Sequence, residues 1–309
     1  MSVTLEKVAY GGWENCLRLS DGSVELIITV DVGPRVIRFG VPGGQNLFKE
    51  NENEMGKTSG TEWIAFGGHR FWHAPEVFPR TYAPDFNPVD YTWQDGILKL
   101  VQKTEPETGI QKEIEITMQN ATVQLTHRLI NRNIWPVELA PWCLSVMAAG
   151  GRALIPQEEF IPHPDVLLPA RKLVLWHFSR MNDPRFVWGD RLIQFRQDSA
   201  FESKQKFGVQ NTLGWAGYAL GNDLFIKSSS LIPEATYPDM GCNFEFFTMP
   251  GFLEVESLGP LVKLEPNAVT EHVERWWLIH DIDLPNEEAP LIAVLNQHLR
   301  HLDLQIIKI

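Results

Sequence analysis

One short stretch of the chain, residues 62–79, gathers several side chains that carry protons or bind anions. It contains two imidazoles that can carry protons, His69 and His73. It also contains a guanidinium, Arg70, and a carboxylate, Glu76. Histidine changes its charge near neutral pH, and a guanidinium binds carboxylates through two parallel hydrogen bonds. Because Trp72 adds a flat apolar face, the stretch predicts a binding or catalytic site. The alternative is that its histidines are hydrogen-bonded structural residues and its aromatic side chains belong to the core.

A later stretch, Phe252–Pro260, offers two carboxylates on one side of a predicted strand. Side chains alternate along a strand, so Glu254 and Glu256 share one face while Val255 points to the other. Two like charges this close can raise the pKa of one carboxyl group, as acid–base catalysis near neutral pH requires. We interpret the pair as a candidate catalytic site; the alternative is a strand face exposed to solvent.

Two further candidates stand apart from these stretches. Arg35 follows a Gly-Pro corner, where its guanidinium is a candidate clamp for a ligand hydroxyl or carboxylate. His163 belongs to a long segment without regular periodicity and is a candidate contact at the rim of a site. For both residues the alternative is ordinary structural packing. Three weaker candidates lie near strand ends: Lys206, Asp239 and Glu245.

A metal site would need a different local structure. The spacing of His69 and His73 would align two ligands on a helix, with Glu76 nearby. Two glycines before these residues and a proline after them disfavour a helix. The zinc-protease pattern also needs glutamate directly after the first histidine, where this chain has Arg70. We therefore expect no metal at these residues.

Composition disfavours several classes of protein. The 309 residues carry a net charge of −12, and a nucleic-acid backbone normally needs a basic face. Three cysteines without a Cys-x-x-Cys pair fit a reducing compartment. The N-terminal residues lack a signal-peptide pattern, and no apolar run approaches the roughly 18 residues of a membrane helix. We expect a cytoplasmic protein without nucleic-acid or membrane partners, and we expect some of its eleven tryptophans to line a concave surface.

The periodicity predicts a chain made almost entirely of strands. Residues 111–118 alternate apolar and polar side chains with period two, and several other segments do the same. An Asp-Gly pair predicts a hairpin turn within residues 15–30. Residues 81–95 and 156–191 follow neither the strand nor the helix period and are predicted to be a loop and a long surface excursion.

One segment near the C-terminus has a helical pattern. Residues 287–300 follow Asn286, a residue that can cap a helix, and carry acidic side chains in the first turn. No linker or break in composition divides residues 1–309. We therefore expect one domain, a large sandwich of packed antiparallel sheets with one short C-terminal helix.

Three segments together resemble the galactose mutarotase-like superfamily, and more closely a bacterial branch of it. They are Gly33–Phe39, the motif Phe66–Glu76, and Leu253–Leu261 followed by His272-x-Glu274-x-Trp276. In order and spacing the resemblance covers nearly the whole chain. The motif at residues 66–76 is similar to the Gly-Gly-containing, Pro-ending segment of hexose-6-phosphate mutarotases.

The resemblance implies an all-β fold, the galactose mutarotase-like β-supersandwich, whose concave face holds a sugar ring. It implies a carbohydrate-binding domain and an isomerase of the aldose 1-epimerase type, which interconverts sugar anomers by acid–base catalysis. The partner would be a small-molecule sugar or sugar derivative. Such chemistry needs only an oriented acid and base, so no cofactor is expected.

Carried over residue by residue, the resemblance assigns roles to the candidates above. Glu256 or Glu254 would be the base that takes the anomeric hydroxyl proton, and His69 is the nearest candidate for the acid that protonates the ring oxygen. Arg35 or Arg70 would clamp the substrate. The remaining candidate substrate contacts are Trp72, His73, Glu76 and His163.

The chain departs from the pattern of these enzymes at one position. Mutarotases carry a further histidine on the strand after an Asn-containing turn, where this chain has Trp142 and Cys143. Either another residue, such as His73 or His163, does that work, or the protein binds a sugar without epimerising it. A lyase or hydrolase is a third reading, since the same fold carries those activities too. The sequence leaves the choice of sugar and the oligomeric state open.

Overall fold

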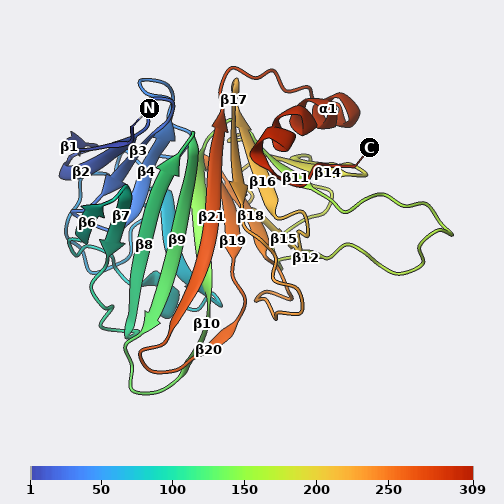
Figure 1. The fold of residues 1–309 in the computed structure, drawn as a ribbon. Helices are drawn as coiled ribbons and strands as arrows, with labels where there is room; N and C mark the ends of the chain where they lie inside the picture. Colours follow the sequence, from blue (N-terminus) through green and yellow to red (C-terminus); the bar gives the residue numbers. More distant parts are fainter. Residues whose placement is uncertain (1, 309) are drawn as a thin grey trace.

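A computed structural model describes residues 2–308 and confirms the all-β prediction. Two large antiparallel sheets pack face to face, and one helix near the C-terminus covers part of the second sheet (Figure 1). Antiparallel sheets of this kind bury one face each and build a shared core between them. This arrangement leaves the outer face of the first sheet free to carry a site.

The first sheet contains eleven strands. Ten of them follow one another in space in this order: β1 (Thr4–Tyr10), β2 (Trp13–Ser20), β3 (Glu25–Thr29), β4 (Arg35–Gly40), β5 (Gly68–Ala74), β10 (Val137–Ala148), β19 (Phe252–Leu258), β18 (Phe244–Met249), β15 (Gln205–Val209) and β12 (Leu173–Leu175). The eleventh, β20 (Val262–Leu264), pairs with the start of β10. The long central strand β10 therefore bonds to β5, β19 and β20.

The second sheet contains ten strands. Their spatial order is β13 (Phe186–Trp188), β14 (Leu192–Arg196), β11 (Arg152–Pro156), β16 (Trp215–Leu220), β17 (Asp223–Ser228), β21 (Val269–Ile279), β9 (Thr122–Asn131), β8 (Ile110–Gln119), β7 (Ile97–Val101) and β6 (Asp90–Gln94). Short 3-10 helices lie at Arg80–Tyr82 and Arg300–Leu302.

Aromatic side chains from both sheets meet in the middle of the core. Phe39 and Phe48 come from the first sheet and its flanking loop, and Phe225 and Trp276 from the second. The ring of Trp276 lies 5.8 Å from Phe39 and 5.5 Å from Phe48, in the tilted and edge-on geometries that aromatic pairs favour. These contacts fix the separation of the two sheets.

The Asp-Gly hairpin forms as the sequence predicts. Asp21 accepts hydrogen bonds from the backbone N–H groups of Ser23 and Val24 at 2.9 and 3.1 Å, and Gly22 has a positive φ of 87°. Glycine adopts this backbone conformation without steric cost. The turn joins β2 to β3, which pair as antiparallel neighbours.

The structure corrects several boundaries. Strand β6 lies inside the predicted loop 81–95, and β12 and β13 lie inside the predicted excursion 156–191. These strands are short or at a sheet edge, so their side chains show little of the alternation that marks a half-buried strand. Strands β1, β5, β11, β15 and β20 were also not predicted from the sequence.

The helix is present, but its predicted cap is wrong. Helix α1 spans Glu288–Leu299 with Glu287 in the capping position and no side-chain cap. Asn286 instead accepts hydrogen bonds from Arg152 and Arg196, which lie on the second sheet. The helix packs its apolar face, including Leu291 and Leu295, against that sheet. Among residues 2–308, no helix is long and apolar enough to cross a membrane.

Candidate functional site

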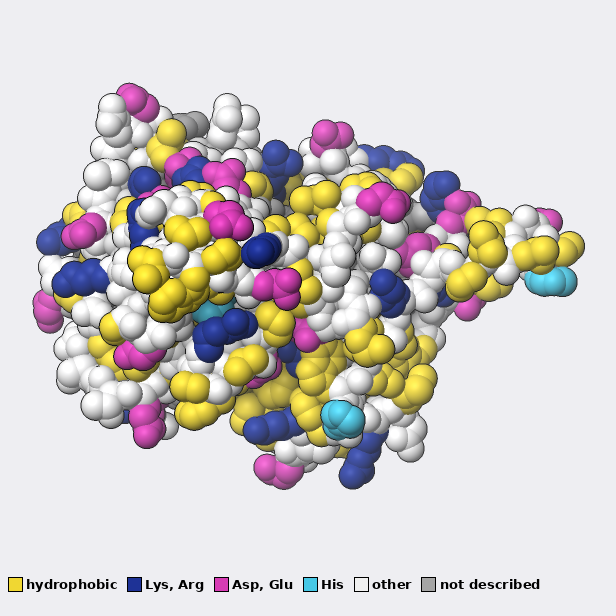
Figure 2. Space-filling view, turned by 90° about the horizontal axis from the view of Figure 1, so that it is seen from below, with side chains coloured by type: hydrophobic (Ala, Val, Ile, Leu, Met, Phe, Trp, Pro, Cys, Tyr) yellow, Lys and Arg dark blue, Asp and Glu magenta, His cyan; other side chains and the backbone are white. Residues whose placement is uncertain are grey.

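A cavity of about 730 Å³ lies on the outer face of the first sheet. Strands β5, β10, β19, β18 and β15 form its floor, and residues from several loops, including 49–51, 63–67, 76–82 and 176–178, form its walls. Its lining includes Trp63, Arg70, Trp72, Glu76, Tyr82, Trp142, Trp176, Phe178, Lys204, Lys206, Phe247, Phe252 and Glu254. On the face of the molecule seen in Figure 2, basic and acidic side chains lie among many apolar ones. A mostly apolar cavity with a few oriented charges is typical of a small-molecule site.

Strand pairing places the charged residues of the floor in rows. Lys206 on β15 is the register partner of Phe247 on β18, which is in turn the partner of Glu254 on β19. All three line the cavity. Because neighbouring strands lie about 4.8 Å apart, the backbones at Lys206 and Glu254 are separated by roughly 10 Å. An aromatic side chain thus lies between a cation and a carboxylate in this row.

Glu254 is held by an ion pair on the cavity floor. Arg70 donates to its Oε1 at 2.9 Å. The Arg70 guanidinium lies 4.4 Å from the ring of Trp72 and 5.3 Å from that of Trp63, which fixes its position through cation–π contacts. The structure therefore brings together three predicted site residues from two distant stretches: Arg70, Trp72 and Glu254.

Glu256 lies deeper, in a second charged cluster. Its Oε2 accepts from Trp142 Nε1 at 2.7 Å and from Lys206 Nζ at 3.2 Å, and Lys206 also pairs with Glu245 Oε2 at 2.8 Å. Glu245 and Glu256 are register partners on neighbouring strands and are both fully buried. Burial raises the pKa of each carboxyl group, and the ammonium of Lys206 opposes that shift.

Lys206 lies between two tryptophan rings. Its Nζ is 4.8 Å from the ring centres of both Trp142 and Trp176. Although burial alone would lower the pKa of Lys206, Glu256 and Glu245 raise it above its usual value. The side chain stays positively charged at the cavity floor.

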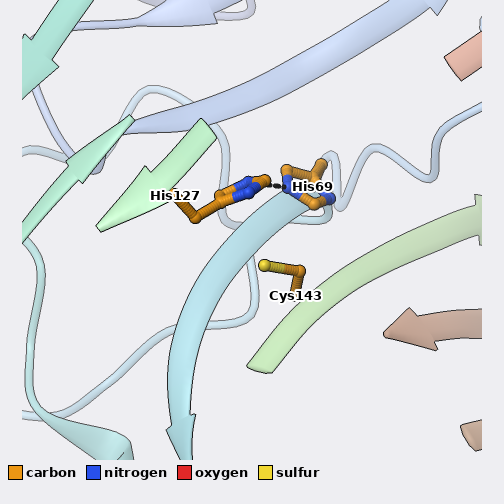
Figure 3. A group of neighbouring side chains, drawn as sticks. All are labelled: His69, His127 and Cys143. Atoms are coloured by element: carbon orange, nitrogen blue, oxygen red, sulfur yellow. Dashed lines mark hydrogen bonds between the residues drawn. The ribbon is translucent and has the colours of Figure 1, made fainter. Parts of the chain in front are cut away.

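His69 does not line the cavity. It is fully buried on the inward face of β5, because side chains alternate and its neighbour Arg70 faces the cavity. Its Nε2 forms a hydrogen bond with His127 Nε2 at 2.9 Å (Figure 3). Its Nδ1 forms another with Ser145 Oγ at 3.0 Å. The structure thus places the predicted acid behind the floor, out of contact with a ligand in the cavity.

The His69 cluster extends across the core between the sheets. His127 Nδ1 donates to the carbonyl oxygen of His272 at 3.3 Å, and His272 Nε2 bonds to Ser257 Oγ at 2.7 Å. Ser257 donates to Glu274, which pairs with Lys227 at 2.8 Å. Every one of these side chains finds a partner, so the cluster joins the two sheets through satisfied polar contacts.

The same cluster contains atoms of the kinds that bind metals. His69, His127 and Cys143 each place one such atom within 4.8 Å of the others (Figure 3). Both imidazoles already bond to each other, and the Lys227 ammonium donates to the Cys143 carbonyl at 3.2 Å. A nearby fixed cation opposes a metal ion, so we interpret this group as a hydrogen-bonded part of the core.

Three other predicted site residues lie away from the cavity. Arg35 is buried and donates to Asp85 at 2.7 Å and to the Gly67 carbonyl at 3.1 Å, so it holds the segment before β5 in place. His73 is buried on the inward face of β5, 3.9 Å from Glu105. His163 is exposed in the segment between β11 and β12 that projects from the body (Figure 1). Glu76, in contrast, lines the cavity.

Sequence reasoning ranked Lys206 and Glu245 below the other candidates and assigned no role to Phe247. Lys206 lies on β15, which pairs with a strand about 40 residues further along the chain. Glu245 lies on β18, which pairs with a strand about 10 residues further along. No local sequence pattern identifies these partner strands. One signal was available: Glu245 lies between the apolar residues Phe244 and Phe246, as Glu254 lies between Leu253 and Val255.

Comparison of structures shows the galactose mutarotase-like fold. The chain matches a galactose mutarotase-like protein from Lactobacillus casei with a TM-score of 0.55 and 10% identity, over 86% of this chain and 100% of that one. An Escherichia coli protein provisionally named an aldose 1-epimerase matches with a TM-score of 0.52 and 11% identity, over 90% and 100%. The chain thus has the β-supersandwich that the sequence motifs predict.

A third structure places the same fold in a longer protein. A TPR-domain-containing protein from Parabacteroides distasonis matches with a TM-score of 0.61 and 13% identity. The match covers 89% of this chain but only 49% of that protein, so this chain spans about half of its length. No protein-family model and no curated protein matches the sequence. At these identities the likeness concerns the fold, and function has to be argued from the cavity.

The buried histidines predict how stability depends on pH. Burial lowers the pKa of His127 and of His272 from 6.5 to about 3. The unfolded chain therefore binds protons first, and the stabilisation from the neutral imidazoles is complete above pH 6.5 and is lost as the pH falls toward 3. Urea midpoints measured across this range should fall steeply for the wild type and less steeply for His127→Gln. His301→Gln, which changes an exposed histidine, should follow the wild type. Equal slopes for His127→Gln and the wild type would contradict the assignment.

Proposed function

We propose that the cavity binds a sugar and that the protein interconverts its anomers, as an aldose 1-epimerase-type isomerase. The observation that carries the proposal is the row Lys206, Phe247, Glu254 across three strands of a mutarotase-like sheet. The apolar face of a sugar ring can pack on Phe247 while its hydroxyl groups meet charged side chains on either side.

Glu254 is the base in this proposal. It lines the cavity, and its ion pair with Arg70 fixes the direction of its carboxyl group. It takes the proton of the anomeric hydroxyl while the bond between the anomeric carbon and the ring oxygen breaks and a carbonyl forms. Rotation about the next carbon–carbon bond and closure on the other face of the carbonyl give the second anomer. The ring oxygen needs a proton while the ring is open.

Glu256 is less suited to be the base. It is fully buried, and Trp142 and Lys206 both donate to its Oε2. Neither carboxyl oxygen of Glu256 belongs to the cavity lining, whereas Glu254 does. We therefore assign Glu256 to the support of Lys206 and Trp142.

A specific observation favours a second candidate function, carbohydrate binding without catalysis. Among residues 2–308, no histidine lines the cavity, although His69 stands at the predicted position one residue away from Arg70. A binding protein would need only the tryptophans and the hydrogen-bonding charges. The two functions differ in whether the protein accelerates anomer exchange.

Exchange NMR of anomer interconversion tests the proposal directly. Over a panel of aldoses, hexose phosphates and uronic acids, we expect the wild type to accelerate exchange for at least one sugar. Glu254→Gln should lower that rate about 100-fold or more, in the range typical of losing a general base, while the sugar still binds. The matched control Glu138→Gln, at an exposed position on β10, should retain the wild-type rate.

Two results would contradict this assignment. Sugar binding by the wild type without any acceleration would favour the binding protein. Wild-type acceleration that Glu254→Gln retains and Glu256→Gln loses would move the base to Glu256.

The cations at the cavity wall predict a preference among sugars. Arg70 and Lys206 are engaged with carboxylates, but Lys49 and Lys204 form no salt bridge within residues 2–308. They are available to an anionic substituent. Lys204→Gln should raise KM for a hexose phosphate or uronic acid about two- to fivefold, as expected for one exposed ion pair, and leave KM for the neutral aldose unchanged.

Salt provides the control for this preference. The advantage of the anionic sugar over the neutral one should shrink as ionic strength rises, because exposed charges are screened. Equal effects of Lys204→Gln on charged and neutral sugars would show that the lysine does not recognise the charge.

A further inference from the structure

We propose that Lys206 is the proton donor to the ring oxygen of the sugar, and that Glu245 and Glu256 hold its ammonium in place and return a proton to it. This inference rests on the proposed isomerase function and supplies the acid that the cavity otherwise lacks. It assigns to Lys206 the role that the sequence resemblance gave to His69.

Position is the first argument. Lys206 lies in the same row as Glu254, with one strand between them, so a ring bound over Phe247 has the base on one side and the ammonium on the other. The anomeric oxygen and the ring oxygen are both bonded to the anomeric carbon and lie on different sides of it. An acid and a base facing each other across the ring can therefore reach one oxygen each.

The surroundings of Lys206 are the second argument. Its ammonium lies between Trp142 and Trp176, 4.8 Å from the centre of each ring, and its side chain is only 7% exposed. A lysine has four rotatable side-chain bonds, and holding it this way removes most of that freedom. What little surface remains faces the cavity. The arrangement orients one ammonium toward a ligand.

The charge balance of the cluster is the third argument. One ammonium serves two fully buried carboxyl groups, at 2.8 and 3.2 Å, while Glu245 Oε1 and Glu256 Oε1 accept no hydrogen bond within residues 2–308. Two buried carboxylates cannot both be neutralised by one cation. The cluster becomes neutral if one carboxyl group keeps its proton, and burial raises the pKa of both in that direction.

With these roles, every proton that moves during ring opening returns during ring closure. Glu254 takes the anomeric proton, the bond between the anomeric carbon and the ring oxygen breaks, and its electron pair goes to the ring oxygen. Lys206 donates a proton to that oxygen and receives one from the protonated carboxyl group of the pair, so the lysine does not stay neutral. On closure the ring hydroxyl returns its proton through Lys206 to the carboxylate, and Glu254 returns the anomeric proton. No net proton or electron is consumed.

A purely structural role for Lys206 is the competing explanation. A buried ion pair contributes little to stability by itself, since desolvation offsets the attraction. Removing Lys206 would in either case leave two buried carboxylates without a cation. The test therefore needs readouts that stability alone does not move.

Chemical rescue provides such a readout. We expect Lys206→Ala to bind the sugar, as followed by tryptophan fluorescence, but to lose about 100-fold or more in kcat. Added methylamine should restore part of the rate. Lys206→Arg should stay slow, because arginine keeps the charge but does not release its proton. Lys103→Ala, at an exposed position outside the site, is the matched control and should behave as the wild type.

A second variant serves as the control for a loss of folding. Lys206→Ala with Glu245→Gln removes the surplus carboxylate together with the lysine, and urea unfolding measures the folded fraction of each protein. If the folded double variant is slow and methylamine rescues it, the inference holds. If either folded variant keeps the wild-type kcat, or if Lys206→Arg is fully active, Lys206 is not the proton donor and the inference is overturned. If the wild type itself accelerates no exchange, the proposed function fails first, and the rescue experiment shows no rate in any variant.

Discussion

Strict alternation of side chains along the strands of the first sheet is the constraint on which the rest of the structure depends. Each strand of the cavity floor serves two environments at once. On β5, Arg70 and Trp72 face the cavity, while His69 and His73 face the core. A shift of one residue in register would exchange the two sets and place four charged or aromatic groups in the wrong surroundings. The site and the core therefore specify each other.

Polar groups are used differently on the two faces. Behind the floor, the His69 and His127 cluster is fully satisfied, and Lys227 and Glu274 neutralise each other at 2.8 Å. At the cavity, Lys206 faces two carboxyl groups, and oxygens of those groups remain without a partner. A satisfied buried network stabilises and orients the sheets, whereas an unbalanced one beside a cavity is typical of a functional site.

The fold that this protein shares with other structures does not by itself fix the chemistry of its cavity. Structures that share only 10–11% identity have the same sandwich over most of their length. The cavity lining includes one carboxylate on β19, Glu254. Trp142, which stands with Cys143 where the sequence resemblance implies a histidine, contacts Glu256 and Lys206.

Local patterns in the sequence were enough to predict the strand-rich fold, the C-terminal helix and the shared face of Glu254 and Glu256, because alternation and turn chemistry act over a few residues. They were also enough to find the stretch that supplies Arg70 and Trp72. They did not show which of His69 and Arg70 faces the cavity, since alternation alone does not say which face is buried. Nor did they bring Lys206 to Glu245 and Glu256, because that contact depends on which strands become neighbours. Strand order is decided by packing across the whole chain, and only the tertiary structure shows it.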